Sequence, residues 1–276
     1  MAFSINTNIS SMVANLHANT SNSGVNSSLG NMSSGSYFST AAYDASGLGI
    51  ANQLSAQVSG LGQAVMNSND SIGMIQVADG ALGNYNDNMQ RIRTLTLQAS
   101  NGTMNASNRA TIQKEIDSLM ESSNDIATST RFNGINLLDG TGGSNGDGTF
   151  NTQSGANSGD TLSFTIGDAR TSSLVGSIDV TSASGRASAL DSIDKAMSSI
   201  DGTRAGLGAS QNAHMSNIRN ISLTQVNVAA AESQMRDVDF ALESANFSQQ
   251  SIMSQVGSFT QAQANASNTN LAGLLS

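Results

Sequence analysis

The two ends of this 276-residue chain carry no charged side chain. Every Asp, Glu, Lys and Arg lies between Asp44 and Glu243, which leaves residues 1–43 and 244–276 neutral. Segments that stay disordered usually carry many charges, because charge keeps an unburied chain solvated. Both ends also hold apolar residues at helical spacing. We therefore expect the two ends to form helices that are buried against a partner surface.

The missing residue types limit the fold and the chemistry further. The chain has no Pro and no Cys. Because Pro breaks a helix interior, its absence favours long uninterrupted helices. Without Cys there is no disulfide framework, no thiolate nucleophile and no cysteine-bound metal. The net charge of −9 argues against nucleic acid as a partner, since phosphate binding needs clustered Lys and Arg.

Residues 1–20 have neither the basic start nor the continuous apolar stretch of a cleaved secretory signal. No run approaches the roughly 18 apolar residues that a membrane span needs, so we expect no membrane insertion. These general rules predict a protein that stays in the cytoplasm or leaves the cell by a route without cleavage.

Apolar residues mark a helical stripe in each neutral end. In the first end they recur three or four residues apart, at Ile5, Ile9, Met12 and Leu16 and again at Val25, Leu29 and Met32. Towards the other end we expect one long helix from Ala187 to about Ala264. It carries two heptad rows, one of Ile221, Val228, Met235, Leu242, Gln249 and Val256 and one of Ala231, Val238, Ala245, Ile252 and Phe259. Since the two ends share one composition, we expect them to lie side by side with their stripes buried.

The first half of the middle region also reads as helix. One heptad row holds Leu54, Leu61, Ile75, Leu82 and Met89, and the second holds Val58, Val65 and Ile72. Ser68 and Asp79 interrupt these rows. A third helix follows the loop at 100–108; we expect Ser107 to cap its start and the helix to end near Asn133-Gly134.

A glycine-rich run at 139–148 predicts a flexible loop, and beyond it Thr161–Ile166 and Ser177–Thr181 alternate as strands do. The fold class predicted is mainly α. We expect a long coiled-coil-like helical bundle from paired N- and C-terminal segments, with a small β-hairpin region in the middle.

No motif indicates catalysis, a metal or a cofactor. His17 and His214 lack a second ligand at helical spacing, and we expect both on helix surfaces. Asp237 and Asp239, two residues apart on the expected helix, would point to different faces and could not act as an acid–base pair. Nucleophile, P-loop and dinucleotide-binding patterns are missing. We expect no enzyme.

Four segments of the chain resemble bacterial flagellin. They are the start MAFSINTNIS, the segment YDASGL from Tyr43, the segment NDSIGMIQVADGAL from Asn69 and the segment TRFNGINLL from Thr130. The stretch from Ala262 to Leu275 is similar to flagellin too. The likeness covers roughly the first 140 and the last 90 residues, in the family's order and spacing.

The resemblance implies a subunit that polymerises into the flagellar filament for swimming motility. Residues 1–43 with 238–276 would form the inner-core domain, similar to domain D0 of flagellins. Residues 44–138 with 187–237 would form the helical rod, similar to domain D1, and 139–186 its loop and β-hairpin region. The outer domains D2 and D3 of longer flagellins would be absent.

The resemblance also implies partners and a location. The partners would be other copies of the chain in a helical homopolymer, the flagellar export chaperone, the filament cap and the hook-filament junction proteins. Type III export without cleavage would make the protein secreted and extracellular. Core and subunit contacts would come from Ile5, Ile9, Met12, Leu16, Val25, Leu29, Met32, Leu242, Ala245, Ile252, Val256, Phe259, Leu271, Leu274 and Leu275.

The segment from Met89 to Leu95 resembles the part of many flagellins that the vertebrate receptor TLR5 senses. Arg91, Leu95 and Glu115 would be the matching contacts, and Thr94 stands where a Glu is usual. The chain also departs from the family around Gly30–Gly35, where charged residues are usual and this sequence is neutral.

Two alternatives remain from the sequence. A hook-filament junction protein of the same superfamily shares the ends, although the segment from Asn69 and the ending LAGLLS favour flagellin. A secreted coiled-coil adhesin belongs to a different class and would need a membrane anchor or a signal.

Overall fold

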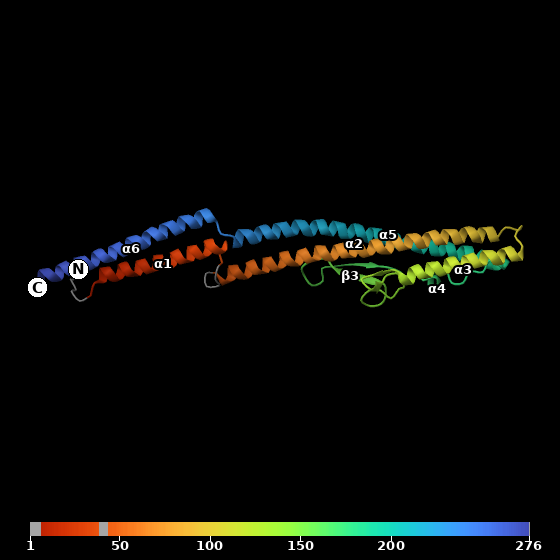
Figure 1. Ribbon diagram of the computed structural model, residues 1–276, viewed down its shortest axis with the longest axis horizontal. Helices are drawn as coiled ribbons and strands as arrows, with labels where there is room; N and C mark the ends of the chain where they lie inside the picture. Colours follow the sequence, from red (N-terminus) through yellow and green to blue (C-terminus); the bar gives the residue numbers. More distant parts are fainter. Residues whose placement is uncertain (1–6, 39–43, 276) are drawn as a thin grey trace. The chain divides into compact units, whose positions relative to one another are not determined.

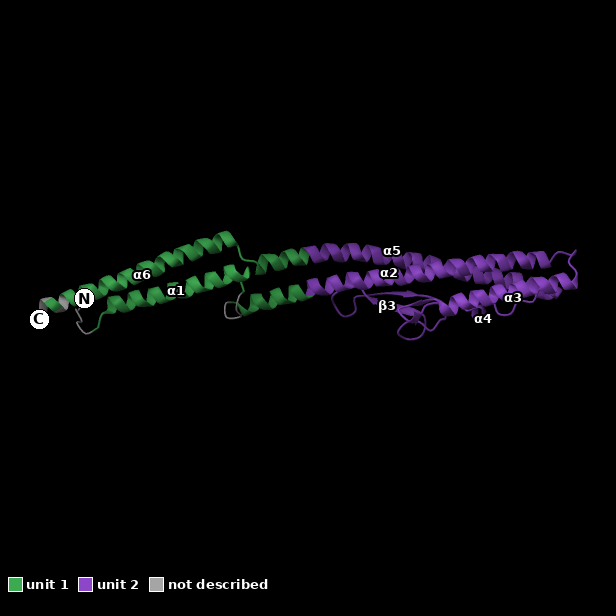
Figure 2. Ribbon diagram, in the orientation of Figure 1, with its two compact units in different colours: residues 1–56, 227–276 green, residues 57–226 purple. Residues whose placement is uncertain are grey.

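The computed structural model describes residues 7–38 and 44–275. Contacts divide the chain into two compact units, one of residues 1–56 with 227–276 and one of residues 57–226 (Figure 2). Ile5 lies outside the described residues. The side chains of Leu271, Leu274 and Leu275 are likewise not described, although their backbone is part of the last helix.

Helices make up most of the described residues, which confirms the predicted fold class (Figure 1). Their bounds are α1 Ile9–Ser34, α2 Ala45–Ala99, α3 Ala106–Ser129, α4 Thr171–Leu174, α5 Ala183–Arg236 and α6 Phe240–Leu275. α2 and α5 have 55 and 54 residues, far longer than an average helix. Such lengths agree with the absence of Pro.

Helix α3 begins and ends earlier than predicted. Its N-cap is Asn105, not Ser107, because the Asn105 Oδ1 accepts the backbone N–H of Asn108 at 2.7 Å. The helix ends at Ser129. Asn133 and Gly134, with φ of 50° and 81°, instead form the tight turn between strands β1 (Arg131–Phe132) and β2 (Ile135–Asn136). Asn-Gly suits this turn because both positions need a positive φ.

The larger hairpin pairs β3 (Thr149–Gln153) with β4 (Thr161–Thr165), with Phe150 opposite Phe164. The prediction of a strand at 161–166 is thus confirmed to within one residue, but the prediction at 177–181 is wrong. That segment forms no strand. Its apolar members enter the core, where Val180 is fully buried and its N–H donates to Gln113 Oε1 at 2.8 Å. Alternation there serves core packing and not strand pairing.

The predicted single C-terminal helix is broken at 237–239, so that expectation was wrong. The chain around Gly35 takes the backbone groups freed by the break: Val238 N–H donates to Gly35 O at 3.2 Å, and Tyr37 N–H donates to Arg236 O at 2.8 Å. Asp239 then caps α6, because its Oδ1 accepts the N–H of Ala241. Asp239 therefore has a capping role outside the regular helix, which corrects the helical placement assumed above.

The core of the 57–226 unit follows the heptad rows predicted for α2. Leu61 packs with Ile221 of α5, and further along α2 the side chains of Ile75, Leu82 and Met89 are buried. The two polar residues that interrupt the heptad rows, Ser68 and Asp79, have different surroundings in the structure. Asp79 accepts from Arg204 Nε of α5 at 2.8 Å, whereas Ser68 is buried and its hydroxyl has no hydrogen-bond partner.

His214 is not on a helix surface, contrary to the prediction. Its side chain is buried, and its ring meets the edge of Phe164 with centroids 6.0 Å apart at 83°. Burial lowers the pKa of the His214 imidazole, because desolvation disfavours its charged form. The hairpin therefore covers this residue. His17, by contrast, is exposed as expected.

Candidate functional site

Helices α1 and α6 of the two neutral ends lie side by side, as predicted, and run antiparallel (Figure 1). Asn8 Nδ2 donates to the carbonyl oxygen of Ala264 at 3.0 Å, and Asn31 Nδ2 donates to Glu243 Oε1 at 3.3 Å. The start of α1 therefore meets the later part of α6 near Ala264, and the end of α1 meets the start of α6.

Small and polar side chains form the contact between α1 and α6. On α1 the buried residues recur at intervals of three, four or seven and are Ala14, Ala18, Ser21, Ser28 and Asn31. On α6, Gly257 faces Ala18 so closely that a Cβ at Gly257 would lie 3.1 Å from that of Ala18. The helix backbones approach closely because little side chain separates them.

The apolar stripes point away from this contact. On α1 the large exposed apolar residues, here called the α1 outer face, are Ile9, Met12, Val13, Leu16 and Leu29. On α6 the large exposed apolar residues are Phe240, Leu242, Ile252, Met253, Val256 and Phe259, and the last five are here called the α6 outer face. Ala245 is exposed as well, while Val25 and Met32 are partly buried.

The stripes, which the sequence predicted to be buried, are therefore not buried within one chain, and their burial against other copies stays a prediction. Helix geometry gives the reason. At about 100° per residue, Leu16 lies about 200° around the helix from the buried Ala14 and Ala18, so it points away from α6. The α1 outer face exposes 65% of Ile9 and 64% of Leu16. A second stripe of Ala, Ser and Gly at heptad spacing was the sequence signal that could have shown this, since small residues allow close helix contact.

One acidic side chain lies within the otherwise neutral pair. Glu243 is buried in the first turn of α6, where the helix dipole favours a carboxylate, and it accepts from Asn31. Among the described residues no ion pair joins α1 to α6. The contact relies on close packing and amide hydrogen bonds.

An open groove of about 720 Å³ follows the first half of α1. Ile9, Met12, Val13 and Leu16 line it, together with Gln261 from α6. None of its lining residues is charged. The groove is thus an exposed, neutral and largely apolar surface.

The residues predicted as receptor contacts lie in the other unit. Arg91 of α2 and Glu115 of α3 form an exposed ion pair, with Nη2 and Oε1 2.6 Å apart. Leu95 is only 2% exposed and belongs to the hydrophobic core. A direct contact would need an exposed side chain, whereas in this fold Leu95 packs behind the helix face.

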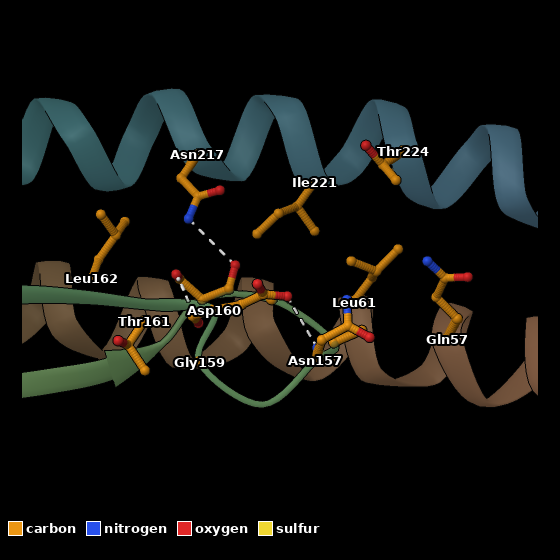
Figure 3. Close-up of a pocket in the computed structure, with 13 residues that line it drawn as sticks. Gln57, Leu61, Asn157, Gly159, Asp160, Thr161, Leu162, Asn217, Ile221 and Thr224 are labelled. Atoms are coloured by element: carbon orange, nitrogen blue, oxygen red, sulfur yellow. Dashed lines mark hydrogen bonds between the residues drawn. The ribbon is translucent and has the colours of Figure 1, made fainter.

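A second open cleft, of about 510 Å³, lies between α2, α5 and the turn of the β3–β4 hairpin (Figure 3). Asp160 is its only ionisable lining residue, and the Asp160 Oδ2 accepts the N–H of Asn157 at 3.1 Å. Asn217 donates to the carbonyl oxygen of Ser154 at 3.3 Å. The cleft thus holds a structured turn and no nucleophile paired with a base.

Within residues 7–38 and 44–275, no group of His, Asp and Glu is arranged to hold a metal ion. No helix of the described chain is both long and apolar enough to cross a bilayer. The two neutral outer faces remain the candidate functional site.

Comparison with known families identifies the protein family to which a chain with these outer faces belongs. The model of the bacterial flagellin N-terminal helical region matches residues 5–142, and that of the bacterial flagellin C-terminal helical region matches residues 190–275. The chain belongs to the bacterial flagellin family. The first matched region contains the α1 outer face, and the second contains the α6 outer face.

Two relatives that match most of their length to this chain support its assignment to the flagellin family. A flagellin of Halalkalibacterium halodurans is 36% identical over 237 residues, which cover 85% of each chain. A flagellar filament 31.3 kDa core protein of Treponema maltophilum is 33% identical over 283 residues, covering 98% of this chain and 99% of the relative.

Solved structures share the fold. The crystal structure of Bacillus cereus flagellin is 30% identical, with a TM-score of 0.50, and the match covers 60% of this chain and 94% of that one. A putative flagellar hook-associated protein from Vibrio parahaemolyticus has a TM-score of 0.58 over 71% of this chain and 100% of that one. At 14% identity it shows a common fold and nothing more.

Proposed function

We propose that this flagellin assembles into its filament by burying the α1 and α6 outer faces against other copies of the chain. The chain is a structural subunit of the flagellar filament, in keeping with both family models and with a relative of nearly equal length that is named a filament core protein.

The observation that carries the mechanism is the exposure of large apolar residues on helices that lack charge. Phe259 is 73% exposed, and Ile9 and Leu16 are nearly as open. Burying one such side chain stabilises an association by about 1.5 to 3 kcal/mol. Contiguous apolar surface of this kind marks an interaction site. Because the outer faces hold no charged residue and the neighbouring Glu243 is buried, contacts through these faces bring no exposed like charges together.

The domain arrangement proposed for the filament follows the family resemblance. Residues 1–43 with 238–276 form the inner core, residues 44–138 with 187–237 form the surrounding rod, and residues 139–186 form its loop and hairpin region. Ile5, Leu271, Leu274 and Leu275 join the outer faces in the inner-core contacts. Domains D2 and D3 are absent, which gives a filament without large outer projections.

The same proposal includes partners other than the chain itself. The export chaperone binds the C-terminal tail in the cytoplasm, and the filament cap and the hook-filament junction proteins contact the growing and basal ends. Export through the type III apparatus without cleavage places the filament outside the cell. Co-purification of the full-length chain with each partner tests these contacts, with a variant lacking residues 244–276 as the control for the chaperone.

Recognition by TLR5 is proposed through the exposed pair Arg91 and Glu115 alone, with Leu95 holding α2 in place from inside the core. A reporter-cell assay with purified monomer tests it. The paired substitution Arg91→Ala and Glu115→Ala should lower the response, and a wild-type monomer that gives no response removes the proposal.

The two alternatives gain no support. The hook-associated relative shares the fold at low identity, and no relative reported above is an adhesin. Electron microscopy of the purified chain at high concentration, with and without sheared filament seeds, tests the filament reading. The expected result is filaments extending from the seeds, and a chain that stays monomeric under both conditions contradicts it.

A further inference from the structure

Phe259 and Leu16, a lining residue of the α1 groove, point to opposite sides of the terminal helix pair. Gly257 faces Ala18 in the contact between the helices. Phe259 is two residues beyond Gly257, about 200° around α6, and therefore points away from α1. Leu16, which lines the groove, is two residues before Ala18 and points away from α6 for the same reason. Each pair thus carries a protruding ring on one side and, on the other, the apolar part of a groove whose lining also includes Gln261 of α6.

We propose that Phe259 of one copy enters the groove lined by Ile9, Met12 and Leu16 on the next copy. This inference rests on the proposed function and deepens it by assigning the contact. Phe259 is the most exposed of the large apolar residues at 73%. Phe240, the other largely exposed aromatic residue of α6, is less open at 60% and stands at the first position of the helix. Buried aromatic anchors dominate the energy of most interfaces.

The occupant of the groove is a second copy of the chain. The groove and the surface around Phe259 are both uncharged, and they lie at the same position along the axis of the helix pair. The groove lining has no charged residue, and neither does any part of the chain after Glu243. A charged partner would lose hydration on entering the groove without gaining an ion pair. Because Ala18 meets Gly257, Leu16 and Phe259 also lie at the same level along the pair. A sideways shift of one copy then brings its ring opposite the groove of its neighbour.

This arrangement gives an open polymer. When a surface meets its own equivalent, the contact closes as a symmetric dimer. When a ring on one side meets a groove on the other, each added copy presents a new ring and a new groove. One ring and one groove per chain are therefore sufficient for continued growth.

Disulfide cross-linking tests the contact cleanly, because the natural chain has no Cys. The double variant Leu16→Cys with Phe259→Cys is oxidised under assembly conditions and run on a denaturing gel without reductant. We expect a ladder of dimers, trimers and longer species. The two sulfurs of one chain cannot join each other, since positions 16 and 259 point to opposite sides of the pair.

Two matched controls distinguish disulfides formed at the proposed contact from disulfides formed by random encounters between chains. Leu16→Cys alone should give at least tenfold less covalent dimer, and so should Leu16→Cys with Leu223→Cys, which places the second sulfur on an equally exposed position of α5. A ladder no stronger than the Leu223 control overturns the inference. Efficient dimers from Leu16→Cys alone overturn it too, because they show that the groove meets its own equivalent.

A second measurement covers the case in which the cysteine variants do not assemble. Phe259→Ala and Leu16→Ala should each raise the critical concentration for seeded assembly by about tenfold or more. If the two side chains touch, the double variant should show clearly less than the product of the two single effects. A full product overturns the inference, whereas failure of the wild-type chain to extend seeds overturns the proposed function itself.

Discussion

Gly257 of α6 lies directly against Ala18 of α1, with little room for a side chain at Gly257 between the two helices. An added Cβ at Gly257 would stand 3.1 Å from the Ala18 Cβ and 3.3 Å from its Cα. This close approach explains why the terminal helices pair through small residues. It also explains why their large apolar residues remain on the outside, available for other copies.

The first prediction concerns this close contact. Gly257→Leu should force α1 and α6 apart, because the new side chain meets backbone and Cβ atoms that cannot move aside without the helix. We expect a loss of about 1 to 3 kcal/mol in the stability of the pair. The thermal melting of assembled filaments, followed by circular dichroism, measures it. Gly30→Ala is the control, since a Cβ at Gly30 meets nothing within 4 Å and should stabilise α1 by about 1 kcal/mol.

The second prediction compares two buried serines one turn apart on α2. Ser68 has no hydrogen-bond partner for its hydroxyl, whereas Ser71 Oγ bonds with Thr152 Oγ1 at 2.5 Å. Ser68→Ala removes an unsatisfied buried group and should raise the free energy of unfolding by about 1 kcal/mol. Ser71→Ala leaves Thr152 without that contact and should lower it by a similar amount. Urea unfolding of the two variants should therefore shift the midpoint in opposite directions, and equal shifts would contradict the assignment.

The third prediction concerns pH. Burial lowers the pKa of His214 below its ordinary value of 6.5, so the unfolded chain takes up this proton at a higher pH than the folded chain. Stability should thus be full above pH 6.5 and fall as the pH drops below it, by up to about 1.4 kcal/mol per pH unit.

Urea unfolding between pH 7 and pH 5 measures this effect. His214→Gln keeps a polar side chain that does not titrate, and its stability should change much less over the same range. If wild type and variant respond equally to acid, another group causes the change and His214 does not.

Much of the fold followed from residue spacing. Leu61, Ile75, Leu82 and Met89 recur at multiples of seven, and the structure buries all four along α2. Spacing succeeds here because a long helix in a bundle turns one face to its neighbours throughout. Where a local capping or backbone contact decided the outcome, spacing failed. Asp239 and the chain around Gly35 break the C-terminal helix, and no apolar period records that break.

The candidate site was predicted in part. The sequence identified Leu16 and Phe259 as members of apolar stripes, yet it could not say which face of each helix would meet the other. Large residues normally mark the inner face, whereas here Ala18 and Gly257 do. The proposed assembly accounts for this reversal, because it uses the large apolar residues for contacts between copies. The prediction that His214 lies on a helix surface was wrong for a related reason. A polar residue type says little about burial when a tertiary contact covers the side chain, as Phe164 of the β3–β4 hairpin covers His214.

The central claim is that assembly buries the two outer faces, and methionine oxidation measures this directly. Met12 of the α1 outer face is 65% exposed in the single chain, and Met253 of the α6 outer face is 51% exposed. Brief treatment with hydrogen peroxide, followed by peptide mass spectrometry, reports how fast each thioether is oxidised in monomer and in filament. Met89, which is fully buried, serves as the internal standard. The account predicts that Met12 and Met253 react readily in the monomer and at least tenfold more slowly in the filament. Unchanged rates at both residues in verified filaments would contradict it.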